Sequence, residues 1–426
     1  MIELRLFREE KERVIAGMKK KKVAPEMLVL VDQIIEKDDD RKKTQTELDG
    51  LLADSKKIAN EVGSYMKAGN SVAANEAKSQ VADLKIKISD GQNKLNQIIL
   101  ELEELIIQLP NIPHISVPEG SHANDNEVFK ESLQNMPNLD KSAKPHWELA
   151  EQYDLISFKD GVLLTGSGFP VYKGKGARLE RALINFFLDE ATKAGYLEVQ
   201  PPLLVNAETA RATGQLPDKE GQMYHCQIDN FYLIPTAEVP LTNLYRDKIL
   251  NIKDFPIQLT GYTPCFRREA GSYGSDVKGL NRLHQFDKIE IVRIEHPDRS
   301  YDALMDMLIH VESLLTKLEL PFRILRLCGG DMSFGSALTF DFETYSAAQG
   351  RWLEVSSVSN FETFQSNRMK LRFKDEDGKS RLAHTLNGSA LALARIVATL
   401  LENHQTEDGI KIPAALRPYT GFDIIN

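Results

Sequence analysis

The sequence predicts an α+β protein, in which an antiparallel β-sheet with helices follows a long, antiparallel helical coiled coil. Residues 27–109 contain no proline and carry apolar residues at alternating steps of four and three. Pro110 and Pro113 end that repeat, because proline stops helix propagation. From about Pro145 onward, strand-like runs such as 231–234 and 353–358 alternate with amphipathic helices such as 177–194 and 389–402. Their irregular spacing favours an antiparallel sheet over β–α–β units.

The N-terminal repeat has the heptad spacing of a coiled coil. Its second half, broken only by Gly91, comprises Ala77, Val81, Leu84, Ile88, Leu95, Ile98, Leu102 and Leu105. The same phase continues backward through Leu51 and Leu48 and reaches Arg41 and Lys37, so the middle of the seam becomes polar. Periodicity alone favours a spacer or a dimerisation coil, with Lys42 and Lys43 on a solvated face.

A turn is expected at residues 63–71, which are rich in glycine and small polar residues. Two helices of about 35–40 residues joined there would form a hairpin roughly 55 Å long. We therefore expect an N-terminal domain over residues 1–109. A linker over residues 110–144 and a larger domain over residues 145–426 would follow.

Composition limits the class of protein. A chain of 426 residues is too long for one ordinary compact domain, and its net charge of −9 argues against a general nucleic-acid coat. Cys226, Cys265 and Cys328 are far apart and form no zinc-binding pattern, which indicates a reducing compartment and no zinc site. A charged N-terminus and the lack of any run of 18 apolar residues predict no signal peptide, no membrane span and a cytoplasmic location.

The most informative segment is residues 266–290. It predicts two strands joined by a Gly/Ser loop, with Arg267, Arg268 and Glu269 at the end of the first strand and Phe286 on the second. An arginine can hold a phosphate through two parallel hydrogen bonds, and an aromatic ring can cover a purine. An ordinary hairpin with an Arg268–Glu269 ion pair would suffice to explain a shorter motif.

Residues 266–290 as a whole resemble motif 2 of the seryl-tRNA synthetases, a family of class II aminoacyl-tRNA synthetases. Residues 195–202 resemble motif 1, the dimer-interface element, and residues 385–395 resemble motif 3. The segments 214–217, 235–240 and 354–360 and the N-terminal hairpin also match, in the correct order. The resemblance therefore covers essentially the whole chain and implies the class II catalytic domain over residues 145–426.

The resemblance implies two catalytic arginines. Arg267 would bridge the serine carboxylate and the α-phosphate, and Arg395 would hold the γ-phosphate. The implied ATP-binding residues are Arg267, Arg268, Glu269, Phe286, Glu354, Val355, Ser356, Ser357 and Arg395. The implied serine-binding residues are Thr236, Ala237, Glu238, Arg267, Glu290, Asn387 and Ser389. Glu354 and Ser357 would supply oxygen ligands to Mg²⁺.

The implied activity is formation of seryl-adenylate from L-serine and ATP, followed by transfer of serine to the 3′ end of tRNA(Ser). A homodimer is implied, tRNA(Sec) is expected as a further substrate, and no zinc is expected. The hairpin would contact the long variable arm of the tRNA, which gives Arg41, Lys42 and Lys43 a possible role. The motif 2 loop departs from the family pattern, because Ser275 and Lys278 stand where arginines are common.

Two alternatives remain at this point. One is a synthetase-like ligase that loads an amino acid onto a carrier protein, which would be expected to lack the N-terminal arm. The other is a catalytically inactive scaffold whose coiled coil binds a partner. The presence of Arg267, Glu290, Glu354 and Arg395 counts against the scaffold.

Overall fold

The computed structural model describes residues 1–137, 139, 143–269 and 278–426. The chain separates into two compact units, one formed by Ile2–Pro110 and the other by Met1 with Asn111–Asn426. No helix in these described ranges has the length and apolar character needed to cross a membrane.

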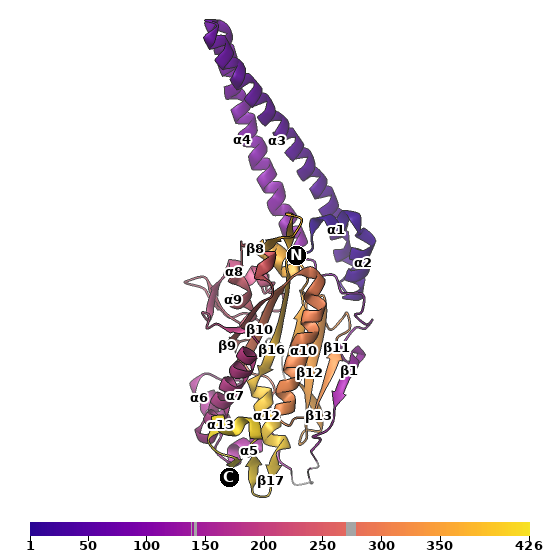
Figure 1. The fold of residues 1–426 in the computed structure, drawn as a ribbon, viewed down its shortest axis with the longest axis vertical. Helices are drawn as coiled ribbons and strands as arrows, with labels where there is room; N and C mark the ends of the chain where they lie inside the picture. The colour runs from indigo at the N-terminus through magenta and orange to yellow at the C-terminus, as the bar shows by residue number, and fades with distance from the viewer. Residues whose placement is uncertain (138, 140–142, 270–277) are drawn as a thin grey trace. The chain divides into compact units, whose positions relative to one another are not determined.

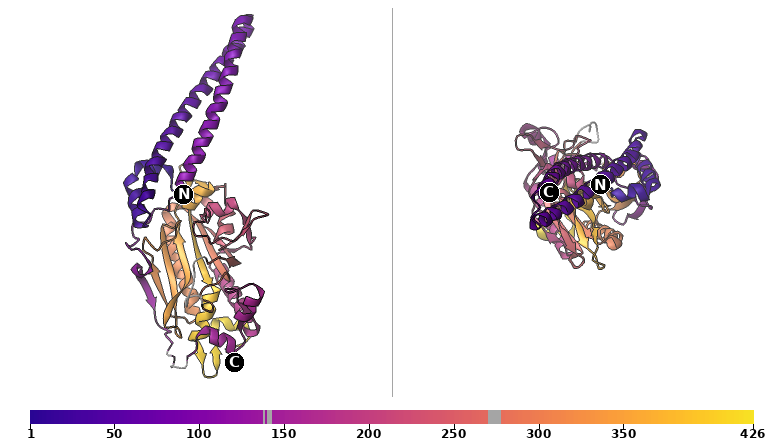
Figure 2. Two further views of the ribbon diagram at one scale, coloured as in Figure 1. Left: turned by 180° about the vertical axis from the view of Figure 1, so that it is seen from behind. Right: turned by 90° about the horizontal axis from the view of Figure 1, so that it is seen from above.

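The smaller unit consists of α1 (Leu4–Glu9), α2 (Lys11–Lys20), a short 3₁₀ turn (Pro25–Leu28), α3 (Val29–Lys67) and α4 (Ser71–Ile106). Helices α3 and α4 run side by side as an antiparallel coiled coil (Figures 1 and 2). Buried positions such as Leu48, Leu95 and Leu102 follow the predicted heptad seam. The turn is shorter than expected, because α3 continues through Gly63 as far as Lys67.

The reversal between α3 and α4 needs only three residues, 68–70. Gly69 adopts φ +72°, a conformation that costs glycine little, and the Asn70 side chain accepts a hydrogen bond from the Ala73 N–H at 3.2 Å. A single left-handed glycine followed by a capped helix is therefore enough to close the hairpin.

The polar part of the seam is an ion cluster around Asp38, which is 1% exposed. Its carboxylate pairs with Arg8 Nε at 2.6 Å, Arg41 Nη2 at 2.8 Å and Lys42 Nζ at 3.2 Å. Burial acts to raise the pKa of Asp38, but the hydrogen bonds from these three cations outweigh it and lower the pKa. Arg41 and Lys42 thus have a structural partner within the hairpin, whereas Lys43 is exposed.

The larger unit is built on a mixed sheet that has eight strands among the described residues, in the order β1-β11-β12-β13-β16-β10-β9-β4. In that order the strands are Glu127–Ser132, Phe322–Arg326, Leu338–Ser346, Arg351–Asn360, His384–Ala392, Gln285–Glu295, Ile257–Phe266 and Leu197–Glu198. All neighbours pair antiparallel except β4 and β9, which pair parallel. This is the predicted α+β arrangement.

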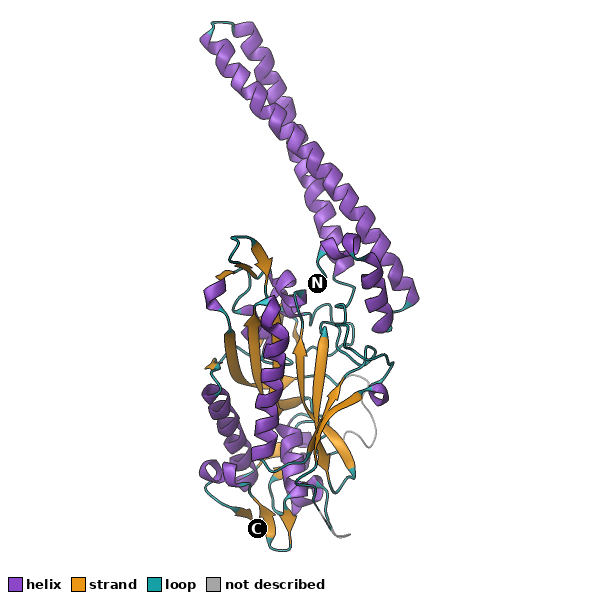
Figure 3. Cartoon of the chain, turned by 45° about the vertical axis from the view of Figure 1, so that its right-hand side comes forward, coloured by secondary structure: helices purple, strands orange, loops and turns teal. Residues whose placement is uncertain are grey.

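Helices and small sheets surround this sheet (Figure 3). The helices are α5 (His146–Gln152), α6 (Phe158–Leu164), α7 (Gly174–Lys193), α8 (Ala207–Thr213), α9 (Glu238–Asn243), α10 (Ser300–Lys317), α11 (Phe364–Met369), α12 (Leu393–Asn403) and α13 (Arg417–Thr420). The short strands are β2 (Ile156–Ser157), β3 (Val171–Tyr172), β5 (Leu204–Asn206), β6 (His225–Cys226), β7 (Phe231–Leu233), β8 (Ile249–Asn251), β14 (Arg372–Lys374), β15 (Ser380–Leu382), β17 (Gln405–Thr406), β18 (Gly409–Lys411) and β19 (Ile424–Ile425).

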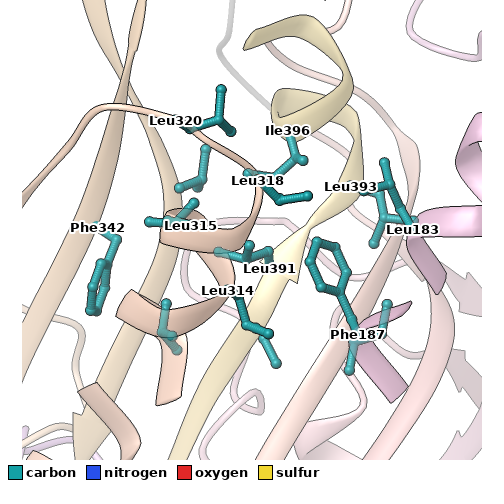
Figure 4. Close-up of a cluster of buried hydrophobic side chains, with 14 of the residues drawn as sticks. Leu183, Phe187, Leu314, Leu315, Leu318, Leu320, Phe342, Leu391, Leu393 and Ile396 are labelled. Carbon is teal, nitrogen blue, oxygen red and sulfur yellow. The ribbon is translucent and has the colours of Figure 1, made fainter. Parts of the chain in front are cut away.

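One face of the sheet carries the hydrophobic core. Helices α7, α10 and α12 pack there, and Figure 4 shows Phe187, Leu315 and Ile396 converging with Phe342 and Leu391 of the sheet. Alternate residues of a strand point to opposite faces. The other face includes the polar residues Lys288 and Glu290 of β10, Ser359 of β13, and Asn387 and Ser389 of β16.

Two expectations differ from the structure. Residues 389–392 were expected to be helical but belong to β16, because Ser389 pairs with Glu290 and Ala392 with Lys288 in the ladder with β10. The ladder overrides the helical propensity of an alanine- and leucine-rich run, and α12 begins only at Leu393. Within residues 110–144, where a linker was expected, strand β1 pairs with β11 at the edge of the sheet.

Candidate active site

A cavity of about 550 Å³ lies over polar residues of β10, β13 and β16. It is lined by most of the residues expected from the sequence: Thr236, Glu238, Arg267, Glu269, Phe286, Glu290, Glu354, Val355, Ser356, Ser357, Asn387, Ser389 and Arg395. Two expected residues are not among the lining residues. Ala237 is fully buried, and Arg268 donates its backbone N–H to the Gln222 carbonyl at 2.9 Å.

The strand register brings these distant residues together. Glu290 of β10 lies opposite Ser389 of β16, and Asn387 of β16 lies opposite Ser359 of β13. Positions two apart on one strand share a face, so Ser389 and Asn387 both point into the cavity, while the intervening Gly388 packs against Val358. Segments about 100 residues apart thus form one polar wall.

At one end of the cavity a hydrogen-bonded group joins Thr236, Lys288 and Glu290. The Lys288 ammonium lies 2.6 Å from Glu290 Oε2 and donates to Thr236 Oγ1 at 2.8 Å. Thr236 Oγ1 in turn donates to Glu290 Oε2 at 3.2 Å. All three residues are buried, so the arrangement has little freedom to relax.

Glu238 adds a second buried carboxyl group to this end. Gln365 Nε2 donates to Glu238 Oε1 at 2.7 Å, and Thr385 Oγ1 fixes the amide orientation by donating to Gln365 Oε1 at 2.7 Å. Burial, and then the nearby Glu290 carboxylate, raise the pKa of Glu238 from 4.5 to about 7. The cavity therefore contains a carboxyl group poised to lose its proton when a cation binds.

Lys288 was missed by the sequence reasoning, although a signal was present. Lys288 and Glu290 lie on either side of Ile289 in one predicted strand, so both must point to the same face. A lysine and a glutamate on one face of a central strand need each other or a polar ligand. That pattern could have placed Lys288 in the site beside Glu290.

Arg267, which also lines the cavity, follows the last residue of β9. Its backbone N–H donates to the His284 carbonyl at 2.9 Å, which continues the hairpin pairing beyond the strands. Its guanidinium carbon lies 5.3 Å from the centre of the Phe286 ring. A cation is attracted to the face of an aromatic ring, so this contact holds Arg267 beside Phe286, which also lines the cavity.

Glu269 does not form the Arg268 ion pair of an ordinary hairpin. Instead its Oε2 atom lies 3.0 Å from Arg282 Nη1, a residue of the returning chain. Glu269 has φ +49°, a conformation that is uncommon outside glycine and is often found at functional sites. Its side chain also lines the cavity.

Arg395 extends from the first turn of α12, and two backbone carbonyls hold it. Arg395 Nε donates to the Asn281 carbonyl at 3.1 Å, and Arg395 Nη1 donates to the Glu354 carbonyl at 2.6 Å. The Glu354 carboxylate is 3.7 Å from Nη1. The neutral carbonyls make the closer contacts and hold the guanidinium in place, whereas Glu354 forms a longer ion pair with it, so a bound anion would share this arginine with Glu354.

Glu354 and Ser357 share one face of β13 because the strand contains a bulge. Glu354 pairs with Glu343 and Ser357 with Asp341, so Val355 is an extra residue in the ladder. Without the bulge, residues three apart would point to opposite faces. Glu354 is half exposed at the cavity, while Asp341 Oδ1 is buried and has no hydrogen-bond partner among the described residues.

These oxygen atoms suit a hard divalent cation. In the described part of the chain, however, no three His, Cys, Asp or Glu residues are grouped closely enough to hold a metal ion by themselves. An ion held through Glu354 and Ser357 would therefore need most of its ligands from bound phosphate and water, which is the usual situation for Mg²⁺.

The motif 2 loop is described only at its end. Ser275 lies outside the described residues. The Lys278 ammonium is 4.5 Å from the centre of the Trp147 ring, which is a cation–aromatic contact.

Comparison with known proteins identifies the family of this site. The model of the tRNA synthetase class II core domain (G, H, P, S and T) matches residues 224–404, and that of the seryl-tRNA synthetase N-terminal domain matches residues 1–113. The serine–tRNA ligase of Salinibacter ruber is 49% identical over 99% of this chain and 98% of the relative. That of Chlorobaculum parvum is 44% identical over the full length of both chains.

Solved structures agree. The crystal structure of seryl-tRNA synthetase from Pyrococcus horikoshii complexed with ATP has a TM-score of 0.90 and 33% identity, and the match covers 100% of this chain and 99% of that chain. The structure of the Naegleria fowleri cytoplasmic enzyme shares the fold, with a TM-score of 0.86. The chain belongs to the seryl-tRNA synthetase family, the serine–tRNA ligases of class II.

Proposed function

We propose that the chain joins L-serine to tRNA(Ser) in two steps within the cavity described above. First, a serine carboxylate oxygen attacks the α-phosphorus of ATP, and diphosphate leaves. Second, a hydroxyl group of the 3′-terminal ribose attacks the activated carbonyl carbon of seryl-adenylate, and AMP leaves. The first step requires fixed positive charge near the α-phosphate more than it requires a proton-transfer group.

One observation carries this proposal. A single cavity holds two fixed arginines together with a buried Thr–Lys–Glu group and a second carboxyl, Glu238. Arg267 is the proposed bridge between the serine carboxylate and the α-phosphate, and Arg395 is the proposed partner of the γ-phosphate. Phe286 and Glu269 would contact the adenine, and the Arg267–Phe286 contact supports adjacent positions for the base and the α-phosphate.

The other end of the cavity is the proposed serine pocket. Glu238, whose pKa is raised to about 7, would pair with the α-ammonium group together with Thr236. Glu290 and Ser389, opposite each other in the ladder, would bond the serine hydroxyl, and Asn387 would line the same pocket. A site that bonds a substrate hydroxyl rejects the analogue lacking it by about 10⁴-fold or more. Threonine would be rejected by the shape of the pocket.

Glu354 and Ser357 are the proposed ligands of Mg²⁺, which would neutralise charge on the ATP phosphates. The bulge in β13 that aligns their side chains supports this assignment. A Glu354→Gln variant should require a higher Mg²⁺ concentration for half-maximal activity. An unchanged Mg²⁺ requirement would contradict the assignment.

The activity is tested by ATP–diphosphate exchange with serine, threonine and alanine, followed by charging of total tRNA. We expect exchange with serine only. Arg267→Ala should abolish exchange, whereas the matched variant Arg381→Ala, a surface arginine paired with Asp375 and Asp377, should retain it. Absence of serine-dependent exchange would refute the proposal, and exchange without tRNA charging would favour a carrier-protein ligase.

The helical hairpin is the proposed tRNA-binding element. Its exposed basic residues, including Lys43, Lys56 and Lys57, suit recognition of an RNA backbone by shape and charge. Replacement of residues 31–99 by a short flexible linker should leave serine-dependent exchange intact and abolish charging. Normal charging by this deletion variant would refute the division of labour.

We further propose that the chain acts as a homodimer and also serylates tRNA(Sec). The outermost position of β4, where Leu197 is 64% exposed, supports an interface at the motif 1 edge. Sedimentation velocity should give twice the mass of the chain, and Leu197→Lys should weaken the dimer. Charging of a tRNA(Sec) transcript tests the second substrate directly.

A further inference from the structure

A buried His–Glu pair lies outside the cavity and has no part in the chemistry proposed above. His146 begins α5 and Glu402 is near the end of α12, and both side chains are completely buried. His146 Nδ1 lies 2.7 Å from Glu402 Oε1, and the His146 backbone N–H donates to the same oxygen at 3.0 Å. Ser346 Oγ donates to the other carboxylate oxygen.

The other ring nitrogen of His146 supports the chain that returns from the motif 2 loop. The Leu280 backbone N–H donates to His146 Nε2 at 2.9 Å. Nε2 must therefore be the acceptor, and the proton lies on Nδ1, facing Glu402. Gly279, with φ +67°, is in direct contact with the ring, because a Cβ atom there would lie 2.2 Å from Nε2.

A second connection runs through Gln349. Its amide nitrogen donates to Glu402 Oε1 at 3.0 Å, and its oxygen accepts from Asn281 Nδ2 at 3.1 Å. Asn281 is thus held by its side chain, while its carbonyl accepts the hydrogen bond from Arg395 Nε. Leu280 and Asn281 both line the cavity. A continuous set of hydrogen bonds therefore joins Glu402 to the arginine proposed for the γ-phosphate.

We propose that His146, oriented by Glu402, is a positioning residue that holds Leu280 and Asn281 and, through Asn281, fixes Arg395 for ATP. This inference rests on the proposed function of Arg395. The serine-binding group on Thr236, Lys288 and Glu290 has no bond to this network among the described contacts. Loss of His146 should therefore weaken the binding and use of ATP and leave serine binding unchanged.

A purely structural role predicts a different result. If the pair only joined α5 to α12, its loss would lower stability and the fraction of folded enzyme, with no selective effect on either substrate. Kinetics normalised to active sites separate the two roles, because the unfolded fraction then cancels.

The test compares His146→Ala, His146→Gln and His404→Ala in the full-length chain. His404 follows α12 and bonds the Leu318 carbonyl at 3.1 Å, so it is a matched histidine with no hydrogen bond to a cavity residue in the described part of the chain. ATP–diphosphate exchange, normalised by active-site titration, gives kcat and the KM values for ATP and serine. Thermal unfolding is measured in parallel.

We expect His146→Ala to lower kcat/KM for ATP by about 10-fold to 100-fold, since misplacement of a binding group by about 1 Å costs about 100-fold. The KM for serine should stay within about twofold. His146→Gln should recover most of the loss, because its amide can accept from Leu280 and donate to Glu402. His404→Ala should leave the kinetics unchanged.

An unchanged kcat/KM for ATP in His146→Ala, or an equal rise in both KM values, would overturn the inference. If His146→Ala does not fold, Gln349→Leu serves instead, because it removes the link to Asn281 and keeps the His–Glu pair; the same selective loss for ATP is expected. Failure of the wild-type chain to exchange with serine would refute the proposed function. If the wild-type chain catalyses serine-dependent exchange and the His146→Ala variant has the same kcat/KM for ATP, only this inference is refuted.

Discussion

Replacement of Glu238 by glutamine should make the protein more stable at neutral pH while weakening serine binding. Glu238 is buried, and Gln365 Nε2 donates to its Oε1 atom at 2.7 Å. A glutamine side chain has nearly the same shape, and its amide oxygen can accept the same hydrogen bond. The substitution therefore removes the ionisation of this group with little change in packing.

The magnitude follows from the pKa of Glu238. Burial and the Glu290 carboxylate raise this pKa from 4.5 to about 7. At about 1.4 kcal/mol per pH unit, a charged Glu238 costs the folded state about 3 kcal/mol. At pH values between 4.5 and about 7, Glu238 keeps its proton in the folded state but has lost it in the unfolded state. The contribution of Glu238 to stability therefore falls as pH rises from 4.5 to about 7 and is constant above that range.

Urea unfolding at about pH 5 and about pH 8 measures this effect. The free energy of unfolding of Glu238→Gln, minus that of the wild type, should be about 2–3 kcal/mol larger at the higher pH. Glu376→Gln, at an exposed glutamate, is the matched control and should show no such change. An equal difference at both pH values would refute the assignment of the raised pKa.

The same variant reports on serine binding. Because the proposed partner of Glu238 is the serine ammonium group, binding should release a proton from Glu238 below about pH 7. Calorimetry in two buffers with different heats of ionisation measures this release. The wild type should release protons on binding serine, and Glu238→Gln should bind more weakly without this release. Equal serine affinity in both proteins would contradict the proposed contact.

Two other buried ion pairs give further predictions. Lys288→Met leaves the Glu290 carboxylate buried without its cation and should destabilise the protein by about 3–5 kcal/mol, as measured by urea unfolding. No loss of stability would show that Glu290 does not need Lys288 in the folded protein. In the N-terminal unit, Arg8→Ala removes one of three cations around Asp38 and should cost about 1–3 kcal/mol, as measured by thermal unfolding of the unit Ile2–Pro110. A change below about 0.5 kcal/mol would show that Arg41 and Lys42 suffice.

The sequence by itself determined the hairpin, the fold class and most of the candidate cavity. The heptad repeat required a partner helix, because an apolar seam in water is stable only when it is covered. Prolines marked the end of the coil. The motif around Arg267 was specific for one family because residues 266–290 as a whole, in residue type and in order, resemble motif 2 of the seryl-tRNA synthetases.

Only the tertiary structure decided how these residues are held. Strand β1 could not be predicted, because its residues are mostly exposed and its strand conformation depends on pairing with β11, almost 200 residues away. Ser389 joined a strand because β10 and β13 lie on either side of it, which no local propensity records. The polar seam at Arg41 became an ion cluster only when α1 supplied Arg8 to Asp38.

The site shows the same division. Sequence motifs named Glu290, Glu354 and Arg395, but not the groups that orient them. The bulge at Val355, the amine of Lys288 and the buried network of His146 depend on ladder register and on contacts between distant segments. The sequence shows which chemical groups a site can contain, because these depend only on residue type. The orientation and the pKa of each side chain depend on neighbours that only folding brings within hydrogen-bonding distance.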